Sequence, residues 1–344
     1  MRNSSIELFR IIAMLFVVIV HCNGWLVGGM PDDFDETNIS TFRISQALIQ
    51  AITCTCVNMF LLISGWFGLR LKWKTILSIY LLLVFISIPF YLFSCCIGED
   101  FSVRELLSRF KAISRSGYFV EGYLLLVFFS PVFNAFIDKL GKKIILWVSL
   151  FWAIEFYFEF LIHDGDLGFK EGYSFIHFVL IYMIGRTLSL YQDKLLQINS
   201  VVFIVLYICS TSSIFALYVF LDMRSIYDYS SPANIVAASC LFLLFAKKTF
   251  YNNWINWIAS STFAVYLVHT CNPVLSWLRA FDIEMLENNT YPVYLAIMGL
   301  AIILIFGGSI MYDKIVKLIV SPIVSKIEHQ INRFNNKHSL YLNG

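Results

Sequence analysis

The stretch IELFRIIAMLFVVIVHCNGWLV, residues 6–27, decides the fold class of this chain. A helix that crosses a bilayer needs roughly 20 predominantly apolar residues, and this stretch supplies them. Similar stretches follow near residues 44–68, 73–97, 118–137, 143–162, 172–192, 199–221, 230–246, 253–273 and 291–312. We therefore expect an all-α, polytopic integral membrane protein with about ten transmembrane helices. Because the stretch at 230–246 is short, the count could also be nine or eleven.

The composition supports the same fold class. Of 344 residues, 59% are hydrophobic and 14% are charged, whereas soluble domains have about 45–50% apolar and about 25% charged residues. The formal net charge is only +2, and no basic run indicates a nucleic-acid partner. The eight cysteines are scattered without metal-ligand or redox spacing, so we expect no metal site and no redox pair. The partner that the composition indicates is the lipid bilayer.

Charges in the connecting loops predict the topology, since cytoplasmic loops carry an excess of Lys and Arg. The basic loops contain Arg70, Lys72 and Lys74, then Lys139, Lys142 and Lys143, then Lys247 and Lys248, and finally the tail residues Lys314, Lys317, Lys326, Arg333 and Lys337. The alternate loops are acidic and contain Asp32, Asp33, Asp35 and Glu36, then Asp164 and Asp166, then Asp282, Glu284 and Glu287. We expect both termini in the cytoplasm, one transmembrane domain over residues 1–320 and a cytoplasmic tail over 321–344. Residues 98–117 mix both signs and suit an amphipathic helix at the outer surface.

Ionisable side chains inside a span are costly and mark functional candidates. In the first span, Glu7, Arg10, Met14, Val17 and His21 share one helix face. Arg10 and His21 lie about 16 Å apart along the axis, with Arg10 toward the cytoplasm and His21 in the outer half. Two interpretations are open at this point. Both side chains face one site, or Arg10 pairs with Glu7 while His21 hydrogen-bonds a carbonyl.

Other spans place polar groups at a similar depth. The ninth span carries Tyr266 and His269 one turn apart, the fourth begins with Glu121, and the fifth contains Glu155 and Glu159. These groups and His21 could meet in one layer, although Glu121 and Glu159 could equally face the surface. In the second span, Asn58 and Ser64 could donate hydrogen bonds into a cavity. The Ser64-Gly65 pair could instead mark a packing interface with close backbone approach.

Three segments, in this order, resemble the bacterial membrane acyltransferase-3 family, which O-acylates surface polysaccharides, peptidoglycan and some antibiotics. Residues 6–21 match the family's first helix, with Arg10 and His21 separated by ten residues. Residues 58–67 look like its Phe-x-x-Ser-Gly-Phe segment, and Ser261 to His269 is similar to its Ser-x-x-Ile-Tyr-Leu-x-His segment. Residues 71–78 depart from the family because they lack its frequent Arg-Arg pair and Pro.

The resemblance implies an O-acyltransferase of the bacterial inner membrane that moves an acyl group, expected to be acetyl, from acyl-CoA (acetyl-CoA) to a hydroxyl of a cell-surface or exported polysaccharide. No tightly bound cofactor is implied, and the oligomeric state is not indicated. Arg10, Arg70, Lys72 and Lys74 would bind the donor phosphates, and His21 would act as general base. Glu121 would orient His21, while His269, Tyr266 or Asn58 would stabilise the oxyanion or position the sugar. We favour direct transfer over an acyl-enzyme on Ser64.

Two alternatives belong to other functional classes. A transporter or flippase for a glycan or small solute would also have about ten helices with intramembrane charges. A structural subunit would explain the fold but would leave the alignment of Arg10 and His21 unexplained. Binding of coenzyme A to the purified protein separates the enzyme from both.

Overall fold

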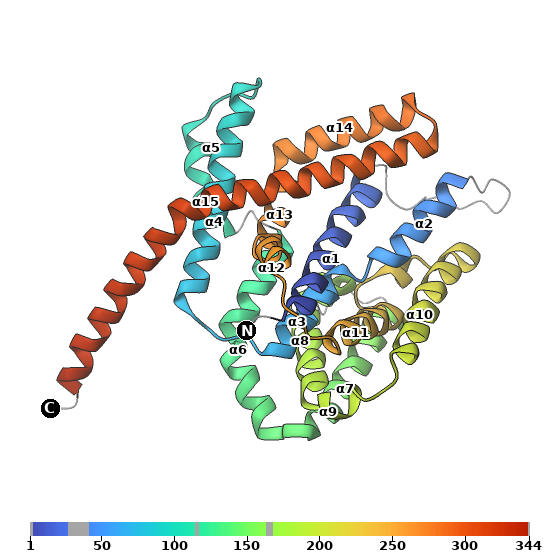
Figure 1. Cartoon of the computed structure of the whole chain (residues 1–344), viewed down its shortest axis with the longest axis horizontal. Helices are drawn as coiled ribbons and strands as arrows, with labels where there is room; N and C mark the ends of the chain where they lie inside the picture. Colours follow the sequence, from blue (N-terminus) through green and yellow to red (C-terminus); the bar gives the residue numbers. More distant parts are fainter. Residues whose placement is uncertain (1–2, 27–40, 114–116, 163–167, 343–344) are drawn as a thin grey trace.

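The computed structural model describes residues 3–26, 41–113, 117–162 and 168–342, and these residues form helices and connecting loops with no strand (Figure 1). The longer helices are α1 (Ser4–His21), α2 (Thr41–Thr53), α3 (Cys56–Phe67), α4 (Trp73–Cys96), α6 (Tyr118–Leu140), α7 (Ile144–Glu155), α8 (Phe175–Leu190), α10 (Ser200–Leu221), α11 (Pro232–Ala246), α14 (Asn272–Asn288) and α15 (Tyr291–Leu342). The shorter ones are α5 (Val103–Ser108), α9 (Gln192–Leu195), α12 (Asn253–Ala259) and α13 (Thr262–His269). Short turns extend α1 (Cys22–Leu26), α7 (Phe156–Leu161) and the start of α11 (Arg224–Tyr227). The all-α fold class is confirmed.

Membrane-spanning length is found in seven stretches of the described chain. One of them, Tyr118–Glu159, contains α6 and α7 and so covers two of the predicted spans. The predicted sixth span corresponds to α8, a shorter apolar helix. The chain is therefore a polytopic membrane protein, as predicted, whereas the count of ten stays a prediction. The acidic cluster at 32–36, together with Arg115, Asp164 and Asp166, lies outside the described residues.

The ninth predicted span, 253–273, is wrong as a single helix, because the structure divides it into α12 and α13 at Ser260-Ser261. The last carbonyl groups of a helix lack intrahelical partners, so an external donor can end the helix. Here Lys314 donates to the Trp257 carbonyl at 2.9 Å and to the Ser260 hydroxyl at 2.7 Å, and Lys317 donates to the Ser260 carbonyl at 2.6 Å. Two lysines of α15 thus stabilise the break that sets the position of α13.

Helices α3 and α8 pack tightly in the centre of the bundle (Figure 1). A Cβ atom on Gly65 would lie 2.3 Å from the Tyr182 carbonyl oxygen, and one on Gly185 would lie 2.7 Å from the Leu62 carbonyl oxygen. Only glycine allows two helix backbones to approach this closely. The packing interpretation of the Ser64-Gly65 pair is therefore confirmed. Around this contact, α1 packs against α3, α11, α12 and α13.

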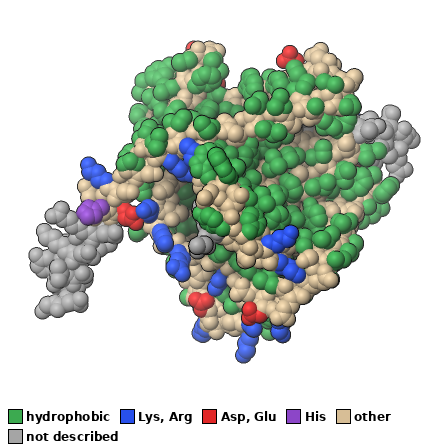
Figure 2. All heavy atoms as spheres, viewed as in Figure 1, with side chains coloured by type: hydrophobic (Ala, Val, Ile, Leu, Met, Phe, Trp, Pro, Cys, Tyr) green, Lys and Arg blue, Asp and Glu red, His purple; other side chains and the backbone are tan. Residues whose placement is uncertain are grey.

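Several loops predicted to be cytoplasmic lie together at one end of the bundle, which we call the inner end. Asn3 donates to the Lys248 carbonyl at 3.0 Å, and Lys74 pairs with Glu328 at 2.7 Å. Most Lys and Arg side chains on the face shown in Figure 2 also gather in its lower half, where both chain termini lie in Figure 1. The cytoplasmic position of this end stays a prediction.

Two helices extend to or beyond the ends of the bundle. The predicted domain boundary at residue 320 falls inside α15, which continues as one helix to Leu342, so the division into a transmembrane domain and a tail stays a prediction. Residues 272–288, expected to be an acidic loop, form α14, in which Asp282 is buried and accepts a hydrogen bond of 2.8 Å from the Tyr294 hydroxyl. Burial raises the pKa of Asp282 to about 6. The mixed-charge loop contains a short helix, α5, at the end opposite the termini (Figure 1).

Candidate active site

A cavity of about 620 Å³ lies between α1, α3, α4, α6 and α13. Met14, Val17 and His21 of α1 line one side of it, and these three residues belong to the helix face predicted from the sequence. Tyr266, Leu267 and Thr270 line the side formed by α13 and the residue that follows it. The polar end of the first helix and the ninth predicted span therefore meet at one cavity. Its volume falls in the range of ordinary small-molecule sites.

His21 and His269 are in direct contact although 248 residues separate them in the chain. The Nδ1 atom of His21 lies 2.8 Å from Nε2 of His269. The Nδ1 atom of His269 lies 2.6 Å from the Val265 carbonyl oxygen, which can only accept a hydrogen bond. His269 must therefore carry its proton on Nδ1, so its Nε2 accepts from His21.

This hydrogen-bond chain fixes the tautomer of His21. When both imidazoles are neutral, Nδ1 of His21 is the donor and its lone pair lies on Nε2. A lone pair on a positioned imidazole is what a general base requires. His269 thus orients His21 in the way that a carboxylate orients the histidine of a hydrolase triad. The π-helical turn Cys22–Leu26 begins directly after His21, and such turns occur frequently at functional sites.

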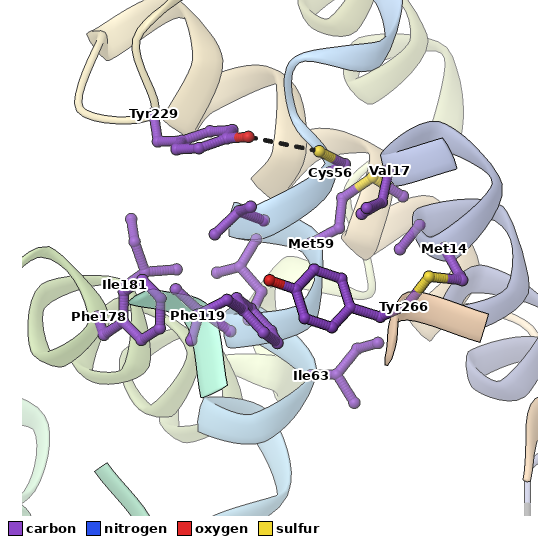
Figure 3. Close-up of a cluster of buried hydrophobic side chains, with 14 of the residues drawn as sticks. Met14, Val17, Cys56, Met59, Ile63, Phe119, Phe178, Ile181, Tyr229 and Tyr266 are labelled. Carbon is purple, nitrogen blue, oxygen red and sulfur yellow. Dashed lines mark hydrogen bonds between the residues drawn. The ribbon is translucent and has the colours of Figure 1, made fainter. Parts of the chain in front are cut away.

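Aromatic side chains form much of the remaining wall. The rings of Tyr266 and Phe119 lie 5.3 Å apart, and Phe119 also contacts Phe60 at 6.3 Å. Figure 3 shows Tyr266 reaching toward Phe119, with its hydroxyl directed into the cluster. Gly117, just before α6, has a φ of 83° and lies beside the Tyr266 hydroxyl. This left-handed conformation favours glycine and allows α6 to begin at the cavity.

Arg10 lies on the same helix face as His21, yet it does not line this cavity. Its Nη1 atom donates to Glu7 at 2.8 Å, and its side chain is 27% exposed. The structure therefore contains the Arg10–Glu7 pair that was one of the two sequence interpretations, together with His21 in a cavity from the other. Arg10 lies nearer the inner end of α1 than His21 does, and it lies outside the cavity lining.

Glu121 does not reach His21. It is exposed in the first turn of α6 and does not line the cavity. The hypothesis that Glu121 orients the imidazole disagrees with this placement, since His269 makes that contact. The sequence predicted the position of Glu121 near the start of its helix, but it did not predict that the side chain faces away from the cavity.

Asn58 belongs to a different polar cluster, buried behind the cavity. Its amide nitrogen donates to the Tyr229 carbonyl at 2.8 Å and to Asn234 at 3.0 Å, and its oxygen lies 2.8 Å from Nε2 of His177. Nδ1 of His177 lies 3.0 Å from Glu155. The hypothesis that Asn58 positions a sugar or the oxyanion is therefore not supported. His177 was not among the residues predicted for the site. The only feature of the sequence that could have indicated it is an ionisable residue inside an apolar span.

Ser64 is not arranged as a nucleophile for this cavity. Its hydroxyl donates to the Phe60 carbonyl at 3.1 Å, and the residue does not line the cavity. The geometry thus favours direct transfer over an acyl-enzyme on Ser64.

The predicted donor-binding cations differ in their positions. Arg70 and Lys72 are exposed at the inner end, whereas Lys74 lines a second cavity of about 400 Å³ between α4, α13 and α15. Lys317 also lines this second cavity. Successive turns of α4 line the two cavities, with Leu82 in the second and Leu83 in the first. The two cavities therefore lie along the same helix, α4, on the way from the inner end toward His21.

The sequence model of the acyltransferase-3 family, described as an acyltransferase domain, matches residues 3–310. The chain belongs to this family. Searches of curated proteins and of solved structures gave no significant match. The match includes all three segments that carried the sequence resemblance, as well as the cavity and the histidine pair. This chain is therefore a membrane acyltransferase, and the family favours the enzyme over the transporter and structural alternatives.

Proposed function

We propose that this membrane acyltransferase moves an acetyl group from acetyl-CoA to a hydroxyl of a cell-surface or exported glycan, in the bacterial cytoplasmic membrane. The observation that carries the proposal is the His21–His269 pair beside the cavity, because it provides a base with a defined tautomer. The family supports the acyl-transfer class. The acetyl group, the coenzyme A donor and the glycan acceptor are parts of the proposal.

The chemistry needs one base and one oxyanion donor. Nε2 of His21 takes the proton of the acceptor hydroxyl as its oxygen attacks the thioester carbonyl carbon. Collapse of the tetrahedral intermediate forms the ester and breaks the carbon–sulfur bond, and the imidazolium returns its proton to the leaving thiolate. The Tyr266 hydroxyl, which also lines the cavity, is placed to donate to the oxyanion. Direct transfer therefore requires no covalent enzyme intermediate.

The two cavities suit a donor and an acceptor that come from different compartments. The second cavity, with Lys74 and Lys317, lies on the side predicted to face the cytoplasm, where acyl-CoA is made. Lysine binds phosphate groups as a point charge. Arg10, Arg70 and Lys72 add positive charge at the same end. The first cavity would receive the thioester from this side and the glycan hydroxyl from the other.

The test is transfer of labelled acetyl from acetyl-CoA to surface glycan by the protein in lipid nanodiscs. The acceptor is the glycan of the producing bacterium after mild base has removed its esters. We expect label in base-sensitive esters on the glycan, detected by mass spectrometry, and a matched control, His329→Ala, to keep full activity because His329 is exposed on α15 far along the chain from the site. Absence of labelled ester with the wild-type protein would contradict the proposal.

A further inference from the structure

The cavity lining includes an ion pair that the mechanism does not use, at the end of the short helix α5. Glu105 and Arg109 line the cavity there, and Arg109 directly follows the helix. In Figure 1, α5 lies at the end of the bundle opposite the chain termini. This is the end from which a surface glycan would approach. The pair is spaced i, i+4 in the mixed-charge segment that sequence analysis placed at the outer surface.

Arg109 is held in place by contacts that leave most of its donors unused. Its Nη2 atom donates to Glu105 at 2.6 Å, and its guanidinium carbon lies 4.7 Å from the ring centre of Tyr91. The Tyr91 hydroxyl is itself fixed by two hydrogen bonds with Ser102, at 3.1 and 2.9 Å. A guanidinium has five N–H donors. Among the described residues, only Nη2 has a hydrogen-bond partner, and the buried Nε has none.

The Arg109 side chain is 16% exposed, but its buried Nε has no hydrogen-bond partner among the described residues. An unpaired buried donor is costly, so it indicates a ligand that completes the site. The ion pair also constrains what that ligand is. Because Glu105 compensates the charge of Arg109, a further carboxylate would bring an uncompensated negative charge to the cavity. A neutral oxygen, such as a sugar hydroxyl or ring oxygen, would accept from Arg109 without that cost.

The aromatic residues of the cavity lining suit the same ligand. Tyr118, Phe119 and Tyr266 line the cavity, and the faces of aromatic rings carry partial negative charge. The C–H-rich face of a pyranose ring is the complementary surface. A sugar in the cavity would thus contact aromatic rings and the guanidinium of Arg109, and it would lie beside His21, which lines the same cavity. Asn272, also in the lining, adds an amide on the α14 side.

We propose that Arg109 binds and selects the acceptor, and that the acceptor is a neutral, polyhydroxylated sugar. This inference rests on the proposed function, because it names the acceptor-binding residue of the same site. Arg109 positions the sugar and takes no part in proton transfer. Its loss should therefore weaken acceptor binding much more than donor binding or the chemical step.

The experiment compares Arg109→Gln with the control Arg104→Gln in nanodiscs, using labelled acetyl-CoA and the de-esterified glycan of the producing bacterium. Arg104 lies on α5, five residues before Arg109, and is exposed and outside the cavity lining. We expect Arg109→Gln to raise the acceptor KM about tenfold to a hundredfold, as loss of a charge-assisted hydrogen bond does. The KM for acetyl-CoA should not change. Arg104→Gln should match the wild type, and Arg109→Lys should recover part of the loss.

Three outcomes would overturn the proposal in distinguishable ways. If the wild type transfers acetyl but Arg109→Gln has the wild-type acceptor KM, Arg109 does not bind the acceptor. If Arg109→Gln changes both KM values and kcat together with the melting temperature, its role is structural. If a uronic-acid-rich fraction of the glycan has a lower wild-type KM than a neutral fraction, the acceptor class is wrong. A wild type that transfers nothing would overturn the proposed function and this inference with it.

Discussion

The protein contains two histidine clusters inside the helical bundle, each with hydrogen bonds of 2.8 to 3.0 Å, that differ in access. His21 contacts His269 at 2.8 Å and lines a cavity of about 620 Å³. His177 contacts Glu155 at 3.0 Å and Asn58 at 2.8 Å, is fully buried and lines neither of the two cavities. His21 lines a cavity, whereas both nitrogens of His177 are hydrogen-bonded inside the bundle.

The difference teaches that a histidine inside a membrane helix is not by itself a catalytic residue. Burial and a close partner are common to both clusters, so neither property identifies the base. What separates them is the cavity, which His21 lines and His177 does not. A base must reach the proton that it abstracts, while a fully bonded buried network holds helices together and specifies their arrangement.

The largest effect is expected for His21→Ala. Removing the general base should lower kcat/KM for acetyl transfer by about 10²- to 10⁴-fold. The melting temperature should change little, because His21 is only partly buried beside a cavity. Acetyl transfer and thermal unfolding of the purified variant check the two expectations. Activity within a few-fold of wild type would assign the base to another residue.

A smaller loss is expected for His269→Ala, because His269 orients the base without replacing it. Without the acceptor for its Nδ1 proton, His21 can adopt the other tautomer and other rotamers. A misplaced catalytic group can cost about 10²-fold. His269→Gln, whose side-chain carbonyl can accept from His21, should recover part of that activity. Equal activity of the Ala and Gln variants would show that His269 does not act through this hydrogen bond.

His177→Ala should affect stability more than chemistry. The substitution leaves Glu155 and the Asn58 carbonyl buried without their partner, and breaking such a pair costs about 3–5 kcal/mol. We expect a clearly lower melting temperature, while the protein that remains folded keeps wild-type KM values for both substrates. A kinetic defect as large as that of His21→Ala, at unchanged stability, would erase the distinction between the two clusters.

The smallest effect is expected for Ser64→Ala. The Ser64 hydroxyl donates only to the Phe60 carbonyl of its own helix, so its removal should change neither the rate nor the melting temperature measurably. Intact-mass spectrometry of wild-type protein after incubation with acetyl-CoA provides an independent check. An acetyl adduct that maps to Ser64 would establish the acyl-enzyme route instead of direct transfer.

Much of the fold was predictable because the bilayer sets helix length and composition. The break at Ser260-Ser261 was not, since it depends on Lys314 and Lys317 from a helix more than fifty residues later in the chain. The number of turns between residues is a local property, whereas capture of a carbonyl by a distant lysine is a tertiary one. The segment that forms α14 was expected to be a loop because it carries Asp282, Glu284 and Glu287. The burial of Asp282 against Tyr294 of α15 is a tertiary contact that the local sequence does not indicate.

The site shows the same division. The first-helix face placed Met14, Val17 and His21 together, and the structure puts all three on the cavity. Depth along a helix follows from residue spacing, so the meeting of His21 and His269 was foreseeable. The rotation of each helix is set by packing, which explains why Glu121 turned outward, Asn58 joined His177, and Arg109 was missed as a lining residue.

The most direct measurement is carbethoxylation of the histidines by diethyl pyrocarbonate in the folded protein, mapped by mass spectrometry with and without the glycan acceptor. This reagent attacks an unprotonated imidazole nitrogen that it can reach. We predict that His21 reacts, that the acceptor slows its reaction, and that His177 reacts only after unfolding. Equal reactivity of His21 and His177, or no protection of His21 by the acceptor, would contradict the assignment of His21 as the base in a substrate-filled cavity.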